Sequence, residues 1–158
     1  MLILPYQESD YTDINEFIDL INPKKFINTP KFISYHGEKF ADRSLVIRDE
    51  KSKIIGFFPA AELNEKIISH PGLTFGGLIT SQKRVIEIFE IYDLIREFYK
   101  KDYKKLIVKL PPIVYLNEQS CVEELYFLYK GSKLCSFYTT SIINLENPIP
   151  VFKNKKRN

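Results

Sequence analysis

The residues best suited to chemistry lie in one short segment near the middle of the sequence. This segment, Ser69 to Leu78, reads SHPGLTFGGL and contains three of the six glycines in the chain. His70 stands near its start, and because an imidazole has a pKa near neutrality, His70 could accept a proton from a substrate. The structural alternative is that His70 only hydrogen-bonds the backbone in the bend before Pro71.

The paired glycines Gly76 and Gly77 suggest a close approach to the main chain. Without Cβ atoms, a ligand or a neighbouring strand can come nearer to the backbone than other residues allow. Backbone N–H groups there could bind a ligand or polarise a carbonyl group, as an oxyanion hole does. The structural alternative is a bulge where a mixed sheet splays apart.

Basic side chains elsewhere are weaker candidates. Lys83 and Arg84 follow the glycine-rich segment and could meet an anionic ligand, although pairs of exposed bases are common on helices. We expect them in the first turn of a helix, where cations oppose the helix dipole. Lys109 lies in an apolar run and would need a partner or a route to solvent. His36 is expected to face inward as a hydrogen-bonded structural residue.

The elements that would position these residues follow from the apolar periodicity. Strands are predicted at 2–4, 44–48, 53–60, 66–69 (running into the glycine-rich segment), 105–110 and 134–145. Helices are predicted from about Asp10 to Ile21, from about Pro30, from about Ser81 to Lys101, and from about Gln119 to Lys130. This alternation predicts an α/β (α+β) fold with one central mixed β-sheet flanked by helices.

The helix from about Ser81 is the longest, and Thr80-Ser81 is its expected cap. Its apolar stripe is Val85, Ile88, Phe89, Tyr92, Ile95 and Tyr99, which should pack on the sheet. The later helix should face inward with Val122, Leu125 and either Leu128 or Tyr129. Gly131 is well placed to end that helix.

Composition excludes several classes of protein. The 158 residues are 44% hydrophobic and 27% charged, which is typical of one globular domain. The net charge of +3 is small, and much of it comes from the tail after residue 152, so a nucleic-acid groove is not indicated. No apolar run has the length of a membrane helix and no signal peptide is evident, so we expect a cytoplasmic protein. Cys121 and Cys135 are isolated, which predicts reduced thiols and no metal site.

Four segments carry a resemblance to a known family. They are YHGEKFADRSLVI (Tyr35 to Ile47), FFPA (Phe57 to Ala60), SHPGLTFGGLI, and PPIVY with the later EEL and L (Pro111 to Leu128). Together with the element order, they resemble the N-terminal half of bacterial tandem-GNAT, Fem-like N-acyltransferases of surface-glycan biosynthesis. The resemblance implies a GNAT-like domain over residues 1–150, followed by a basic tail over 151–158.

The resemblance also implies a reaction and a site. An acyl group would pass from acyl-CoA, the co-substrate, to an amine on a nucleotide-linked amino sugar, without a metal. His70 would act as general base and Tyr115 as general acid for the leaving thiolate. The implied acyl-CoA contacts are Leu73, Thr74, Phe75, Gly76, Gly77, Leu78, Lys83 and Arg84.

Two departures from the family support an alternative. The stretch Thr80 to Arg84 lacks the glycine-rich loop that usually holds the CoA pyrophosphate, and the chain ends where a second GNAT half would begin. The alternative is a non-catalytic GNAT-like module that binds a substrate or a partner. In either case we expect a homodimer or a missing second half, with aromatic surface near Phe137 and Tyr138 covered.

Overall fold

The computed structural model describes residues 1–21, 23–112 and 121–136. The strands are β1 (Leu2–Pro5), β2 (Ala41–Asp42), β3 (Leu45–Arg48), β4 (Ile54–Phe58), β5 (Ala61–Leu63), β6 (Lys66–Ile68), β7 (Ile79–Thr80) and β8 (Leu106–Ile107). The α-helices are α1 (Tyr11–Ile21), α2 (Pro30–Ile33), α3 (Val85–Tyr99) and α4 (Val122–Tyr129). Short 3₁₀ turns are η1 (Glu8–Asp10), η2 (Pro23–Asn28) and η3 (Ser34–Lys39).

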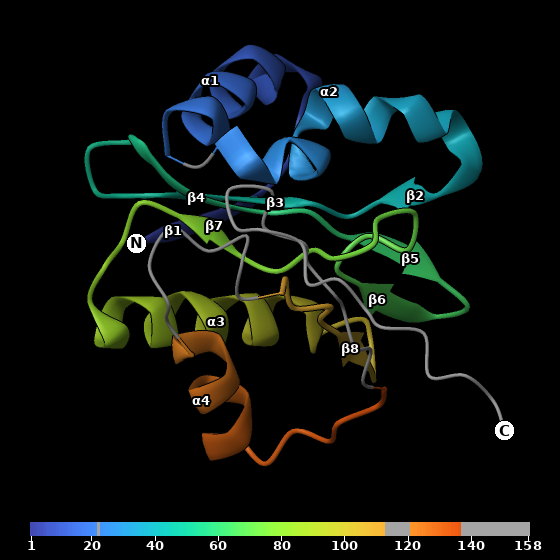
Figure 1. Ribbon diagram of the computed structural model, residues 1–158, viewed down its shortest axis with the longest axis vertical. Helices are drawn as coiled ribbons and strands as arrows, with labels where there is room; N and C mark the ends of the chain where they lie inside the picture. Colours follow the sequence, from blue (N-terminus) through green and yellow to red (C-terminus); the bar gives the residue numbers. More distant parts are fainter. Residues whose placement is uncertain (22, 113–120, 137–158) are drawn as a thin grey trace, which may run out of the picture.

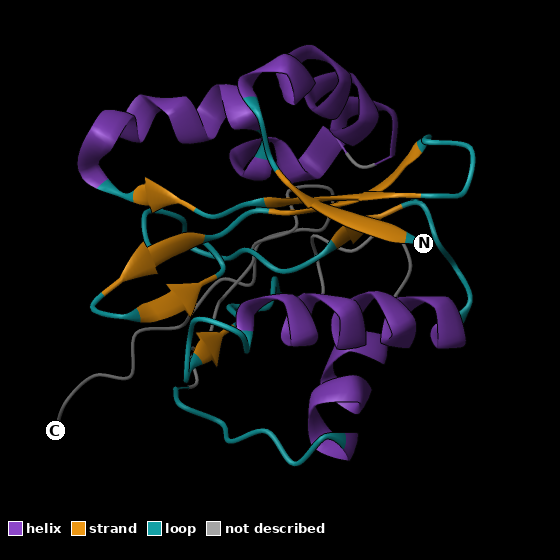
Figure 2. Cartoon of the chain, turned by 180° about the vertical axis from the view of Figure 1, so that it is seen from behind, coloured by secondary structure: helices purple, strands orange, loops and turns teal. Residues whose placement is uncertain are grey.

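The strands form a layer between two groups of helices. Figure 1 shows α1 and α2 over one face of the strands and α3 over the other, with α4 packed beyond α3. Seen from behind in Figure 2, β5 and β6 lie to one side of the longer strands, next to the end of α3 from which β8 follows. The predicted α/β class with strands flanked by helices is therefore confirmed.

The strand layer consists of two four-stranded sheets. The first has the order β1-β3-β4-β7 and all of its pairs are antiparallel, including the predicted hairpin in which Leu45 lies opposite Phe58. The second has the order β2-β5-β6-β8, with β6 and β8 parallel. Because only Pro59 and Ala60 separate β4 from β5, the chain passes directly from one sheet to the other. The very short strands β2, β5 and β7 were not predicted as separate elements.

Alternating side chains of the central strands fill two cores. Leu45, Ile47 and Phe58 pack toward α3, whereas Val46 and Phe57 pack with Ile14 and Ile18 of α1. Successive side chains of a strand point to opposite faces of the sheet, and here both faces are covered by helices. These strands are therefore almost continuously apolar. The sequence prediction for α1 is confirmed, because Ile14 and Ile18 are fully buried.

The helix α3 starts later than predicted. Its first residue is Val85, and Arg84 occupies the N-cap position in an extended conformation. The hydroxyl of Thr80 instead donates to the Ile55 carbonyl at 2.7 Å, and that of Ser81 to the same carbonyl at 3.4 Å. Both hydroxyls therefore bond to β4 instead of capping the helix. Val85 is exposed, while Tyr92, Ile95 and Tyr99 are buried as predicted, together with Ile91.

The helix α4 presents a different face to the core than predicted. Tyr126 is buried and stacks on Tyr92 with ring centroids 5.0 Å apart. Leu125, Leu128 and Tyr129 are exposed, so these predicted inward positions were wrong, whereas Val122 is half-buried. The prediction that Gly131 ends this helix is confirmed, since its φ is +67° and its N–H donates to the Leu128 carbonyl at 3.0 Å.

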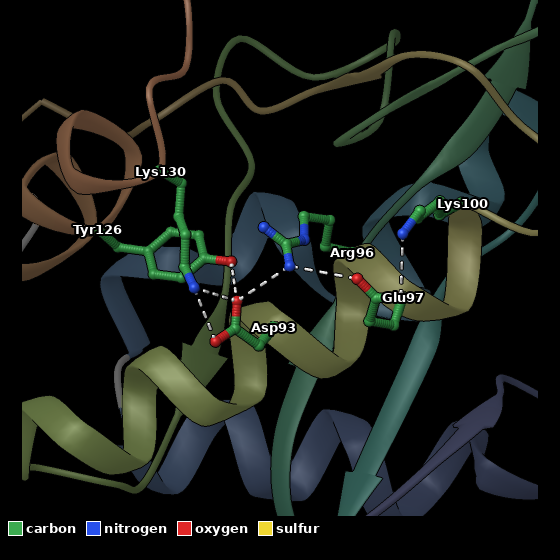
Figure 3. A network of polar contacts seen from close by, with 6 residues as sticks. All are labelled: Asp93, Arg96, Glu97, Lys100, Tyr126 and Lys130. Atoms are coloured by element: carbon green, nitrogen blue, oxygen red, sulfur yellow. Dashed lines mark hydrogen bonds and ion pairs between the residues drawn. The ribbon is translucent and has the colours of Figure 1, made fainter.

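A polar network fastens α4 to α3 (Figure 3). The Tyr126 hydroxyl donates to Asp93 at 2.9 Å, and Lys130 Nζ lies 2.8 Å from the same carboxylate. Burial alone would raise the pKa of Asp93, but the hydrogen bonds from Lys130 and Tyr126 outweigh it and lower that pKa. Arg96 is shared between Asp93 and Glu97 along α3.

Several predictions fall on residues whose structure is not described. These are Tyr115, the aromatic surface near Phe137 and Tyr138, and the domain boundary at residue 150 with its basic tail. The strand predicted at 134–145 is partly covered: residues 134–136 are described and are not in a strand.

Candidate functional site

The segment Ser69 to Leu78 is a loop that connects strands of the two different sheets, so the strand predicted at 66–69 does not run into it. β6 ends at Ile68 and β7 begins at Ile79. Lys109, which follows β8, fastens the loop with three different groups. Its N–H donates to Ser69 Oγ at 2.7 Å, its carbonyl accepts from the Gly76 N–H at 2.7 Å, and its ammonium donates to the carbonyls of Leu73 and Pro71.

These contacts explain the lysine in an otherwise apolar run. Burial lowers the pKa of Lys109, and the carbonyl oxygens of Leu73 and Pro71 are the partners that a half-buried ammonium needs. The loop is also held from the other side of the sheet, where the Asn28 amide donates to the Phe75 carbonyl at 3.1 Å. The loop therefore has a defined conformation.

Two of its glycines are required by packing within the protein. A Cβ at Gly76 would overlap the Ser69 carbonyl, and a Cβ at Gly72 would come within 2.7 Å of His36 Nε2. Gly77 has φ +87°, a conformation that side chains strain. Gly77→Val would therefore strain this backbone, because a β-branched side chain rarely adopts a positive φ.

His70 is deeply buried at the start of this loop. Its side chain is 2% exposed, its φ is +57°, and its Nδ1 has no hydrogen-bond partner. Burial, with a smaller contribution from nearby His36, lowers the pKa of His70 to about 4. The ring is therefore neutral at pH 7. The structural alternative, a backbone hydrogen bond at Nδ1, is not observed.

The predicted hydrogen-bonded role of His36 is wrong. Its Nε2 is buried and also lacks a hydrogen-bond partner. The two imidazole rings lie with centroids 5.5 Å apart, and Phe40 packs edge-on against both at 5.8 and 5.7 Å. The rings of His36, His70 and Phe40 thus pack together in one cluster.

The two histidines line an open cleft of about 1100 Å³. Its described walls come from the end of β1, the start of α1, the α2–η3 segment, the β2–β3 connection and the end of α3. Asp42 and Arg43 lie at the β2–β3 connection, and Tyr99 and Tyr103 at the end of α3. No local sequence pattern marks Asp42 or the two tyrosines as site residues.

Polar contacts hold the wall of the cleft that the β2–β3 connection and the end of α3 form. Arg43 donates to the Tyr103 hydroxyl and to Glu62, both at 3.0 Å, and the Tyr99 hydroxyl donates to the Arg43 carbonyl. Asp42 Oδ1 accepts the Ser44 N–H at 2.6 Å, as a turn residue should. The connection between β2 and β3 is therefore fixed against the end of α3.

The C-terminal end of the loop Ser69 to Leu78 contacts α3 and α4. The Tyr92 hydroxyl accepts the Leu78 N–H at 3.2 Å and donates to the Glu123 carboxylate. Burial is the main cause that raises the pKa of Tyr92 well above its usual range, and the charge of Glu123 is the next cause. Glu123 is half-buried beside Gly77, whereas the neighbouring Glu124 is exposed.

Lys83 and Arg84 lie outside the helix, contrary to the prediction that they occupy its first turn. Arg84 is exposed and pairs with Glu87 at 3.3 Å. Its side chain makes no capping hydrogen bond to α3. Both bases stand at the junction between β7 and α3, next to the positive end of the helix dipole.

Comparison with solved structures identifies the fold. A ribosomal-protein-alanine N-acetyltransferase from Brucella melitensis biovar Abortus 2308 aligns over 90% of this chain and 98% of its own, at 12% identity and a TM-score of 0.54. The fold is GNAT-like. A tetramutant of the BH1408 protein from Bacillus halodurans aligns over 90% of this chain and all of its own, at 13% identity and a TM-score of 0.50.

At the level of sequence, no protein-family model and no curated protein matches the chain. In the described part of the GNAT-like domain, no group of three or more metal-ligating side chains could hold a metal ion. None of its described helices combines the length and apolar character needed to cross a bilayer.

Proposed function

We propose that this GNAT-like domain is an N-acyltransferase that uses an acyl-CoA as donor and a primary amine as acceptor. The observation that supports this most strongly is the course of the loop from Ser69 to Leu78. Near its start, His70 lines the cleft, and its last residue leads through β7 to the junction with α3. A donor at the junction and an acceptor in the cleft would approach the same loop from its two ends.

The junction has features that suit the donor. α3 is a 15-residue helix whose N-cap side chain makes no capping hydrogen bond, so its first N–H groups and its dipole could receive a pyrophosphate. Lys83 and Arg84 stand beside this end. In the loop, the N–H groups of Leu73, Gly76 and Leu78 are already bonded within the protein, so we name Thr74 and Gly77 as candidates for binding the donor.

The reaction would proceed by direct transfer. The amine nitrogen attacks the thioester carbonyl carbon, the N–C bond forms, the C–S bond breaks, and CoA leaves as a thiolate. His70, neutral because its pKa is about 4, would accept the proton that the nitrogen loses. Such a weak base takes this proton most readily once the N–C bond has begun to form and the nitrogen carries positive charge. We assign protonation of the thiolate to Tyr115, from the resemblance alone.

The identity of the acceptor is a finer prediction. The family resemblance points to a nucleotide-linked amino sugar of a surface-glycan pathway and to a homodimer or a second GNAT half. The Brucella relative, by its name, acts on an alanine of a ribosomal protein. Both acceptors present a primary amine, which is what the proposed reaction requires.

Calorimetry with acetyl-CoA and with free CoA tests the donor site first. The double variant Lys83→Ala/Arg84→Ala should weaken acetyl-CoA binding at least fivefold, because it removes two positive charges beside the pyrophosphate site. Lys104→Ala/Lys105→Ala is the matched control beyond the other end of α3, and it should stay within twofold of the parent. Equal losses in the two double variants would contradict the assigned site.

Turnover is tested by following release of the CoA thiol. His70→Asn should lower kcat at least tenfold and leave the KM for acetyl-CoA unchanged. Asparagine is the suitable replacement because it tolerates the left-handed conformation at this position. Binding of acetyl-CoA without transfer to any amine in a broad panel would favour the non-catalytic module.

A further inference from the structure

We propose that the cleft selects a positively charged primary amine carried on an aromatic or apolar body, with Asp42, Glu8 and Asp102 supplying the selecting charge. This inference rests on the proposed function, in which the cleft receives the acceptor. It names the class of acceptor and departs from the nucleotide-linked amino sugar that the family resemblance implies.

The charges of the cleft are unbalanced. Its described lining includes the carboxylates of Glu8, Asp42 and Asp102 and, as the only cation in that described part, Arg43. The Arg43 guanidinium is already engaged by Glu62, the Tyr103 hydroxyl and the Asp42 carbonyl, each at 3.0 Å. The lining therefore presents net negative charge to a ligand.

The carboxylates are available for a ligand. Asp42 uses one oxygen, Oδ1, for the Ser44 N–H, while its Oδ2 makes no hydrogen bond with a described residue. Glu8 and Asp102 are exposed, and neither forms an ion pair within the described part of the chain. An exposed carboxylate without a partner can attract a soluble cation at the mouth of the cleft.

The negative charge also reaches the interior of the cleft. Burial is the main cause that raises the pKa of Tyr6 to about 12, and the next cause is the charge of Asp42. Burial also raises the pKa of Tyr99, again followed by Asp42. The charge of Asp42 thus favours a higher pKa for both tyrosines and also for His70.

Aromatic rings form much of the remaining wall. Tyr6 packs edge-on against Phe57 with centroids 5.9 Å apart, and Phe98 packs against Tyr99 at 5.5 Å. All four line the cleft together with Phe40. Aromatic faces attract cations and also bury apolar groups, so this wall suits an ammonium group attached to an apolar body.

A buried polar atom in the inner part of the cleft is an independent observation that points to a ligand. His70 is 2% exposed, and its Nδ1 has no partner. A buried polar atom is rarely left without a hydrogen bond in a folded protein. A ligand amine that reaches this end would bring a donor to a neutral imidazole.

A nucleotide diphosphate does not fit this lining. Its phosphates carry at least two negative charges, which the carboxylates would repel and for which the described lining has no uncommitted cation. The same charge pattern attracts a protonated amine, which must lose a proton to the solvent before it attacks the thioester. The cleft thereby distinguishes the two acceptor classes by charge.

The test measures binding to the full chain in the absence of acyl-CoA. The probes are 2-phenylethylamine, phenylalanylglycinamide (for an amine at a polypeptide N-terminus), 3-phenylpropionate and uridine diphosphate. We expect one or both amines to bind at least tenfold more tightly than either anion at low ionic strength. The preferred amine distinguishes a small acceptor from a polypeptide. Tighter binding of phenylpropionate or uridine diphosphate would overturn the inference.

Variants then assign the selecting charge. Asp42→Asn keeps an oxygen for the Ser44 N–H and removes the charge, and it should weaken amine binding about threefold to tenfold. Glu8→Gln/Asp102→Asn should have a similar effect. Asp19→Asn is the matched control, because Asp19 is exposed on α1 and does not line the cleft. Unchanged amine affinity in both cleft variants would contradict the proposal.

The outcomes separate this inference from the proposed function. Amine binding without any acyl transfer would contradict the N-acyltransferase and leave the charge selection standing. Acyl transfer to uridine-diphosphate-linked glucosamine but not to the two amines would support the N-acyltransferase and overturn the charge selection.

Discussion

Gly76 lies directly against Ser69 across the neck of the glycine-rich loop. A Cβ at Gly76 would overlap the Ser69 carbonyl oxygen and would come within 2.9 Å of Ser69 Oγ. Ser69, directly after β6, and Gly76, shortly before β7, therefore touch, although the two strands belong to different sheets. The close approach that the glycines suggested is made here by the protein's own backbone.

Gly76→Ala should destabilise the fold by about 2–4 kcal/mol, because the Ser69 backbone would have to move. Urea denaturation followed by circular dichroism measures the free energy of unfolding. Gly37→Ala is the control, since Gly37 has φ +52° and open space around it. It should cost only about 1 kcal/mol through its backbone conformation. An equal or smaller loss at Gly76 would show that the neck is not tightly packed.

The buried imidazole of His70 predicts a loss of stability in acid. Its pKa is about 4 in the folded protein, below the ordinary value of 6.5, so the unfolded chain binds more protons between these values. The free energy of unfolding should fall by about 3 kcal/mol as the pH is lowered from about 6.5 to about 4. His36, Asp42 and Lys109 are the titratable groups that act on this histidine.

His70→Asn tests this assignment through urea denaturation at a series of pH values. The variant lacks the titrating ring and should lose most of the slope between pH 6.5 and pH 4. If the parent and the variant keep the same slope, another group is responsible for the acid sensitivity.

The contact between α3 and α4 can be weakened at one atom. Tyr126→Phe removes the hydroxyl that donates to Asp93 and keeps the ring stacked on Tyr92. We expect a loss of about 1 kcal/mol in the free energy of unfolding. Tyr129→Phe is the matched control, because Tyr129 is 73% exposed, and it should change stability very little. Equal effects would argue against the network in Figure 3.

The sequence predicts the fold well wherever burial gives the apolar residues a regular spacing along the chain. The strands around Val46 and Phe57 and the helix around Ile14 have strong apolar patterns, and all three were predicted. Strands of two or three residues, such as β7 (Ile79–Thr80), are too short to show a period. Their pairing is decided by tertiary contacts.

The start of α3 and the inward face of α4 were mispredicted for local reasons. Thr80 and Ser81 have the hydroxyls of a helix cap, but the Ile55 carbonyl competes for both of them. On α4, Leu128 fits an apolar stripe as well as Tyr126 does. The partners of Tyr126, Asp93 and Tyr92, lie more than 30 residues away in the sequence, so no local pattern reveals them.

The candidate site was predicted only in part. His70 and the glycines stand out because a histidine among glycines is unusual in any regular element. The cleft that His70 lines could not be foreseen, since Tyr6, Asp42 and Tyr99 come from three separate parts of the chain. Each of them looks ordinary in its own segment.

The attachment of the loop to Lys109 has a consequence for the order of folding. The hairpin of β3 and β4 is local and can form early, whereas Lys109 bonds Ser69 across a separation of 40 residues that includes all of α3. Closing so long a connection is entropically costly until α3 has formed and shortened it. During synthesis, a ribosome must therefore release the chain beyond residue 109 before His70 can take its final place. The inner end of the cleft is among the last features of the molecule to be completed.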